Sequence, residues 1–102
     1  MRMLMKVTFP VETFNAAVRD GTAGAKMGRI LEEIKPEAVY FTDEDGKRSG
    51  LLIVDLPHPS KIPALAEPWM LTFNASIELK VAMTPEDLQA SGIDQIGARY
   101  KS

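Results

Sequence analysis

The sequence contains no cysteine and only one histidine among its 102 residues. The lack of cysteine excludes disulfides, thiolate nucleophiles and cysteine-ligated metal sites together. The lone histidine, His58, lies between two prolines, which favours an exposed loop residue over an acid–base catalyst. Because no second histidine or cysteine is present and no carboxylate stands at ligand spacing from His58, the sequence predicts neither a metal site nor a cofactor.

The sequence also lacks long apolar segments and clusters of basic residues. The apolar run before Lys6 is only Met3 to Met5, whereas a secretory signal needs roughly 7–15 apolar residues. No segment approaches the ~20 residues of a membrane span, so we expect a cytoplasmic protein without a membrane partner. The net charge is −2 and the basic residues are scattered, whereas a nucleic-acid surface needs concentrated positive charge. Nucleic acid is therefore not an expected partner.

The overall composition, 45% apolar and 25% charged, is typical of one globular domain, which we expect to span residues 1–102. Period-two alternation predicts strands, and apolar residues three or four apart predict helices. Gly21 and Gly24 predict that the first helical region is either one bent helix or two short ones. Pro68 predicts a kink or a restart in the second. The expected strands are 3–9, 37–42, 51–54 and 75–83, and the helical regions are 11–34 and 60–74.

Two local signals add detail to this order. The acidic segment 43–46 ends in Asp45-Gly46 between two apolar runs, which predicts a hairpin between the second and third strands. The hairpin explains these acids better than a bound cation does. Thr84 followed by Pro85 has the pattern of a helix start, so residues 83–102 are expected to form a short helical extension.

The order strand-helix-strand-strand-helix-strand is that of the ferredoxin-like α+β sandwich. Right-handed crossovers then give an antiparallel sheet of order 4-1-3-2, with both helices on one face. The apolar side of each strand belongs beneath the helices, and that side carries Met5, Val7, Leu52, Val54, Leu79 and Val81.

The opposite face of the sheet, here called the open face, has no helix left to cover it unless the C-terminal segment folds back. Leu4, Leu51 and Ile53 fall on this face, and either Ala38 with Tyr40 or Val39 with Phe41 completes it. Monomers rarely expose an apolar patch of this kind, and pairing two such faces about a twofold axis removes it. The sequence therefore predicts a homodimer with Leu4, Leu51 and Ile53 in its interface.

The open face also carries charges, which make it the candidate ligand site. Opposite charges in a cavity shift each other's pKa values and support proton transfer, although cross-strand ion pairs that fix the register explain the same pattern. The only tryptophan follows Pro68, where it belongs to the core, to the edge of the dimer or to a pocket wall. The candidate binding residues are Lys6, Tyr40, Asp55, Trp69, Glu78 and Lys80.

Five segments of the sequence suggest relatives, and they are residues 35–38, 40–42, 62–64, 66–69 and 81–88. In these segments the chain resembles a group of small bacterial proteins of unknown function, and the likeness extends over nearly the whole chain. The resemblance implies the dimeric α+β barrel superfamily, which includes cofactor-free monooxygenases, muconolactone isomerase-like enzymes and stress-responsive proteins. It assigns no activity to particular residues, because the matched segments have structural roles.

Two functions are therefore expected from the sequence. The first is a homodimeric α+β barrel module that binds a small molecule or a protein partner. The alternative is a cofactor-free oxygenase or isomerase acting on a small hydrophobic substrate between the sheet and the helices. The two differ in their needs, because the enzyme requires an enclosed pocket of about 300 Å³ or more with a few convergent polar groups.

Overall fold

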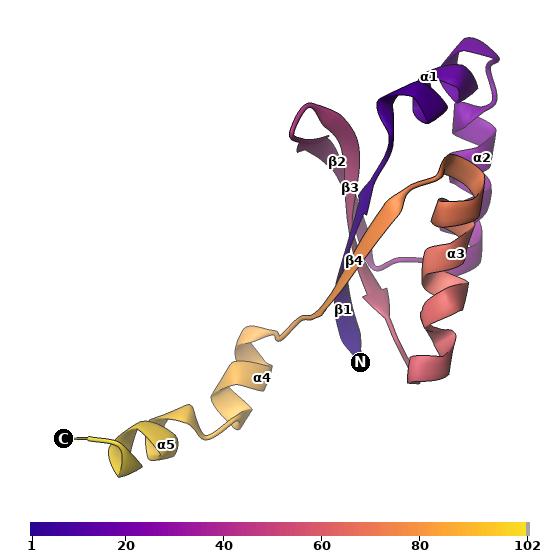
Figure 1. Ribbon diagram of the computed structural model, residues 1–102. Coiled ribbons are helices and arrows are strands. Elements are labelled where there is room, and N and C mark those ends of the chain that lie inside the picture. The colour runs from indigo at the N-terminus through magenta and orange to yellow at the C-terminus, as the bar shows by residue number, and fades with distance from the viewer. Residues whose placement is uncertain (102) are drawn as a thin grey trace.

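The computed structural model describes residues 1–101 as a sheet covered on one face by helices, with a helical tail that extends away from both layers (Figure 1). The strands are β1 (Arg2–Thr8), β2 (Ala38–Glu44), β3 (Lys47–Asp55) and β4 (Ser76–Val81). All neighbouring strands are antiparallel, in the order β2-β3-β1-β4. Read from the β4 edge, this is the order 4-1-3-2, and the α+β arrangement is consistent with a ferredoxin-like sandwich.

The hairpin between β2 and β3 is confirmed, with a tighter turn than expected. Only Asp45 and Gly46 lie in the turn, with φ angles of 51° and 78°. Two successive residues with positive φ match the right-handed twist of the strands, and glycine adopts this conformation without steric cost. Because the turn is so short, Glu44 and Lys47 still pair across the strands, and β3 starts four residues before the segment predicted for it.

The first helical region consists of two helices, α1 (Val11–Arg19) and α2 (Ala23–Ile34). The break lies at Gly21, whose φ of 80° an L-residue rarely adopts. At the same break the carboxylate of Asp20 accepts a hydrogen bond from the backbone N–H of Thr22 at 2.9 Å. Of the two alternatives left by the sequence, the structure thus has the two short helices.

The second helical region begins with the 3₁₀ turn η1 (Pro59–Lys61), whose N-terminal capping residue is His58. The helix α3 (Ile62–Phe73) then runs through Pro68, so of the two expected alternatives the restart does not occur. Proline at position 68 leaves the carbonyl of Ala64 without its helical partner. Ala64 is exposed, so water can hydrate that carbonyl and the helix continues.

The core lies between the sheet and the helices. Met5, Val7, Leu52 and Val54 project from the sheet into it, as predicted, and each is at most 1% exposed. The prediction is wrong for Val81, which is 62% exposed. Val81 is the last residue of an edge strand, so it has a neighbouring strand on one side only.

Beyond β4 the chain forms α4 (Pro85–Ala90) and α5 (Ile93–Arg99), which project from the end of the sheet (Figure 1). The predicted helix start at Thr84 is confirmed: its hydroxyl accepts from the N–H of Asp87 at 3.1 Å, and the Asp87 carboxylate accepts from the N–H of Thr84 at 2.9 Å. The bond from the N–H of Thr84 to the carboxylate is the main cause that holds the pKa of Asp87 below its usual value, and the Thr84 side chain acts in the same direction. The last residue of the predicted extension lies outside the described residues.

Candidate functional site

The open face carries five of the six predicted binding residues. The register places Lys6 between Glu78 on β4 and Leu51 on β3, and Tyr40 on β2 lies opposite Leu51. Leu4 lies opposite Ile53 and Lys80. Ala38 and Tyr40 therefore complete the open face, whereas Val39 and Phe41 face the helices.

Lys6 is held by two carboxylates at once. Its Nζ lies 3.2 Å from Glu44 Oε1 and 3.6 Å from Glu78 Oε2. The hydrogen bond to Glu44 raises the pKa of Lys6, and the charges of both glutamates act in the same direction. A catalytic lysine base needs the opposite shift, toward neutral pH. Lys6 therefore stays an ammonium group, and the Lys6–Glu78 contact is a cross-strand ion pair of the kind that fixes register.

The hollow between these charges is small. Leu4, Lys6, Leu51, Glu78 and Lys80 surround about 60 Å³. Pockets for small-molecule ligands measure about 300–1,000 Å³, so one copy of the open face cannot enclose such a ligand.

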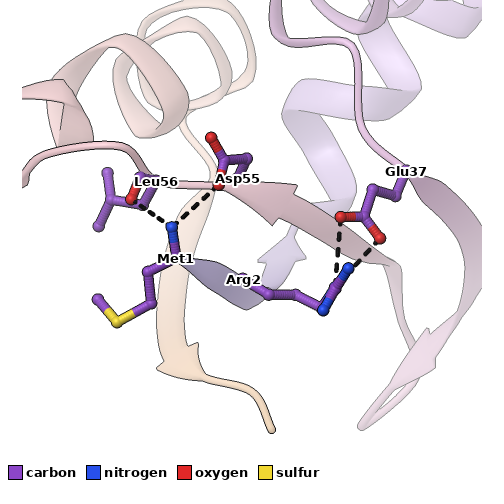
Figure 2. A network of polar contacts seen from close by, with 5 residues as sticks. All are labelled: Met1, Arg2, Glu37, Asp55 and Leu56. Atoms are coloured by element: carbon purple, nitrogen blue, oxygen red, sulfur yellow. Dashed lines mark hydrogen bonds and ion pairs between the residues drawn. The ribbon is translucent and has the colours of Figure 1, made fainter. Parts of the chain in front are cut away.

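The remaining three predicted residues, Tyr40, Asp55 and Trp69, do not line this hollow. Asp55 is at the end of β3, where its Oδ1 accepts from the amino group of Met1 at 3.0 Å (Figure 2). That amino group also donates to the carbonyl of Leu56 at 2.9 Å, and beside it Arg2 pairs with Glu37 at 3.2 Å (Figure 2). Trp69 is fully buried in the core on the helix side of the sheet. The structure therefore does not bring Asp55 or Trp69 together with Lys6 and Glu78.

A second hollow, with a volume of about 580 Å³, lies between α2 and α3. Its walls carry both signs of charge, with Lys26, Arg29 and Glu33 on α2 and Glu67 on α3. Arg29 already pairs with Glu33 at 3.5 Å. Because these charges compensate one another, the hollow favours no particular ligand charge.

A third hollow, which sequence reasoning missed, lies between the start of α2 and the β2–β3 hairpin, and we call it the aromatic slot. Its volume is about 320 Å³, within the range of ligand pockets. Phenylalanine side chains from β2, from α1 and from the end of β1 contribute to its walls. The lining residues are Phe9, Phe14, Ala23, Gly24, Met27, Phe41, Thr42, Arg48 and Ser49.

The base of the aromatic slot belongs to the core and is rigid. The Phe9 and Phe14 rings meet edge to face at 4.9 Å, and Phe14 stacks on Phe73 at 5.2 Å. Phe41 is the exposed part of this wall, since 58% of the residue is accessible to solvent. It packs near Gly50, where an added Cβ would come within 3.6 Å of the ring. The slot thus presents flat apolar surfaces on a fixed base.

Arg48 supplies the charge of the aromatic slot. Its guanidinium carbon lies 4.8 Å from the centroid of the Phe14 ring, and its Nη1 donates to Asn15 Oδ1 at 3.0 Å. Within residues 1–101, no carboxylate lies at ion-pair distance from Arg48. Since a guanidinium carries five N–H donors in a planar fork, most of them remain for a ligand. Arg48 is also the only titratable side chain in the lining, so the slot favours binding over acid–base catalysis.

Two kinds of feature are absent from the part of the chain that the structure describes. Among the residues that the structure describes, no group of three or more His, Asp or Glu side chains is placed to hold a metal ion. No helix within residues 1–101 is long and apolar enough to cross a membrane.

Comparison with known proteins adds no family assignment. No protein-family model matches the chain, and no curated protein matches it significantly. The geometry of the open face and of the aromatic slot is therefore the basis for assigning a function.

Proposed function

We propose that this chain is a homodimeric binding module of the dimeric α+β barrel type, and that its aromatic slot binds a small planar carboxylate. The observation that carries the proposal is an apolar cavity of about 320 Å³ with one uncompensated guanidinium at its wall. The ring of such a ligand would lie against Phe41 and Met27, beside the guanidinium of Arg48. Its carboxylate then accepts a pair of N–H bonds from Arg48.

The electrostatics of the slot support an anion rather than a cation. A buried carboxylate needs a charged partner to offset the loss of hydration, and Arg48 offers one beside the apolar walls. The N-terminus of α2 lies next to Arg48 in the lining, and the helix dipole places partial positive charge there. Both features favour the same sign of ligand charge.

Dimerisation of the module is supported by the open face. Leu4, Leu51 and Ile53 lie side by side at its centre, and each remains partly exposed. Apposition of two such faces removes this apolar surface from water at a gain of about 25 cal/mol per Å². The slot lies on the helix side of the sheet, so pairing through the open faces leaves it accessible.

The test is a titration of the ¹⁵N-labelled protein with 1-naphthoate, followed by the amide resonances. We expect shifts confined to the residues around the slot, and weaker binding of the uncharged analogue 1-naphthamide. A hydrogen bond to a charged group contributes about 1.5–3 kcal/mol, so Arg48→Gln weakens naphthoate binding roughly tenfold or more.

The matched control is Lys47→Gln, which removes one positive charge from the neighbouring position on β3. Lys47 does not line the slot, so this variant should bind naphthoate like the wild type. Equal affinities for naphthoate and naphthamide, or equal losses in the two variants, would refute the assigned ligand class. Shifts that map to another surface would refute the site.

A further inference from the structure

The C-terminal tail, residues 82–101, is separated from the body of the molecule. Its last bond to the sheet is the one from the N–H of Ala82 to the carbonyl of Arg2, at 3.0 Å. After that point α4 and α5 pack against each other, and neither helix contains a buried residue. Figure 1 shows both helices beyond the end of the sheet, on the side away from the helical layer.

The tail nevertheless has one apolar side. Ile93 and Ile96, three residues apart, lie on one face of α5, and Tyr100 follows the helix as its C-cap residue. Leu88 on α4 adds a fourth large apolar side chain, and all four are exposed, with Tyr100 at 81%. An amphipathic helix of this kind becomes stable by packing its apolar face against another surface.

The amount of exposed surface indicates how large that other surface is. The chain exposes 7099 Å², whereas a compact monomer of 11.2 kDa exposes about 5,700 Å². The radius of gyration is 17.3 Å, against about 13 Å for a compact domain of this length. Two copies therefore have an excess of roughly 2,800 Å² to bury, which lies in the range of obligate homodimer interfaces.

The connection between β4 and α4 disfavours a return of the tail to its own sheet. Ala82 is still bonded to β1, and Thr84 is fixed by its reciprocal bonds with Asp87. Only Met83 is left to reverse the direction of the chain. Short connections that cannot fold back favour exchange of the segment between copies.

We propose that the tail is an exchange arm, which packs its apolar side on the open face of a second copy while that copy's tail packs on the first. Reciprocal exchange about a twofold axis closes the assembly at two chains. The arm covers the β2 side of the open face, where Tyr40 is 69% exposed on the edge strand. This inference rests on the proposed homodimer and assigns the residues that complete its interface.

Because the chain has no cysteine, one introduced cysteine places a single spin label. Ala98→Cys lies on α5 opposite the apolar side, so the label does not block the contact. In the first sample, Ala98→Cys protein without ¹⁵N carries the spin label, and it is mixed and refolded with ¹⁵N-labelled wild-type protein. Broadening of the amide resonances then reports only contacts between copies. In a second sample the spin-labelled chain itself carries ¹⁵N and is diluted into excess unlabelled wild type, which reports contacts within one chain.

We expect broadening of Leu4, Tyr40 and Ile53 amides in the first sample. Spin-labelled Glu32→Cys, on the exposed side of α2, is the control and should leave the open face of other copies unbroadened. Broadening of the open face in the second sample alone means that the arm folds back on its own sheet, and absence in both means that it stays free; either result overturns arm exchange. Light scattering on the same samples separates the two proposals, since a monomeric wild type overturns the homodimer as well.

Discussion

The ammonium group of Lys6 lies 3.2 Å from the carboxylate of Glu44, although β3 separates the strands that carry them. The long lysine side chain reaches across β3 to the end of β2, where the short hairpin turn holds Glu44 in the strand. With Glu78 on the other side, Lys6 links both edges of the sheet. Lys6 and Glu78, two of the open-face charges that the sequence offered for either proton transfer or register-fixing ion pairs, thus belong to a bridge across the sheet.

This bridge gives folding stability a defined pH dependence. The raised pKa of Lys6 means that its contribution is complete below the ordinary lysine value of 10.5 and is lost as the pH rises through the higher value of the folded state. Lys6→Gln should therefore lower the urea midpoint by a constant amount between about pH 6 and 9, and by less above about pH 10.5. Lys80→Gln on the same face is the control, and identical pH profiles for the two variants would contradict the bridge.

Replacement of Ile53 tests the open face as a dimer interface. Wild-type protein at micromolar concentration should scatter light as a particle of twice the 11.2 kDa chain mass. A lysine at Ile53 places an unpaired charge in the centre of the interface, and such a charge costs several kcal/mol, so the dimer should dissociate. Val18→Lys, at an exposed apolar position on α1, is the matched control and should stay dimeric.

If Ile53→Lys does not fold, Tyr40→Glu serves instead, because Tyr40 is exposed and its replacement leaves the core intact. A wild type that scatters as a monomer, or a folded Ile53→Lys or Tyr40→Glu variant that dimerises like the wild type, would show that the open face does not form the interface.

Substitution of Trp69 tests the packing of the core rather than the aromatic slot. It is fully buried, and within residues 1–101 its indole N–H has no hydrogen-bond partner. Trp69→Ala should lower the free energy of unfolding by about 3–5 kcal/mol through the cavity it leaves. Trp69→Phe also leaves a cavity but removes the unpaired N–H, so it should cost less than half as much.

The measurement is urea unfolding followed by circular dichroism, since both variants lack the tryptophan fluorophore. A Trp69→Phe variant as unstable as Trp69→Ala would mean that the indole N–H is satisfied in solution. Naphthoate binding provides the control, because Trp69 does not line the aromatic slot and Trp69→Phe should leave binding unchanged.

The elements that sequence reasoning predicted well depend on neighbouring residues. The alternation in β1, the Asp45-Gly46 turn and the Thr84–Asp87 cap are each specified within a few positions, because backbone geometry and hydrogen bonding act over that range. Of the kink or restart predicted at Pro68, the restart does not occur, for a related reason. Whether a proline interrupts a helix depends on the hydration of a carbonyl four residues earlier, and that is decided by which side of α3 faces water.

The sequence by itself determined the α+β class and the two faces of the sheet. Only the tertiary structure decided that Arg48 meets Phe14, that Lys6 reaches Glu44, and that the C-terminal tail leaves its own sheet uncovered. The physical reason is that side-chain periodicity reports which way a residue points within its own element. Which distant side chains meet depends on strand register, on the twist of the hairpin and on the direction of one connection, and none of these is encoded in a short stretch of residues.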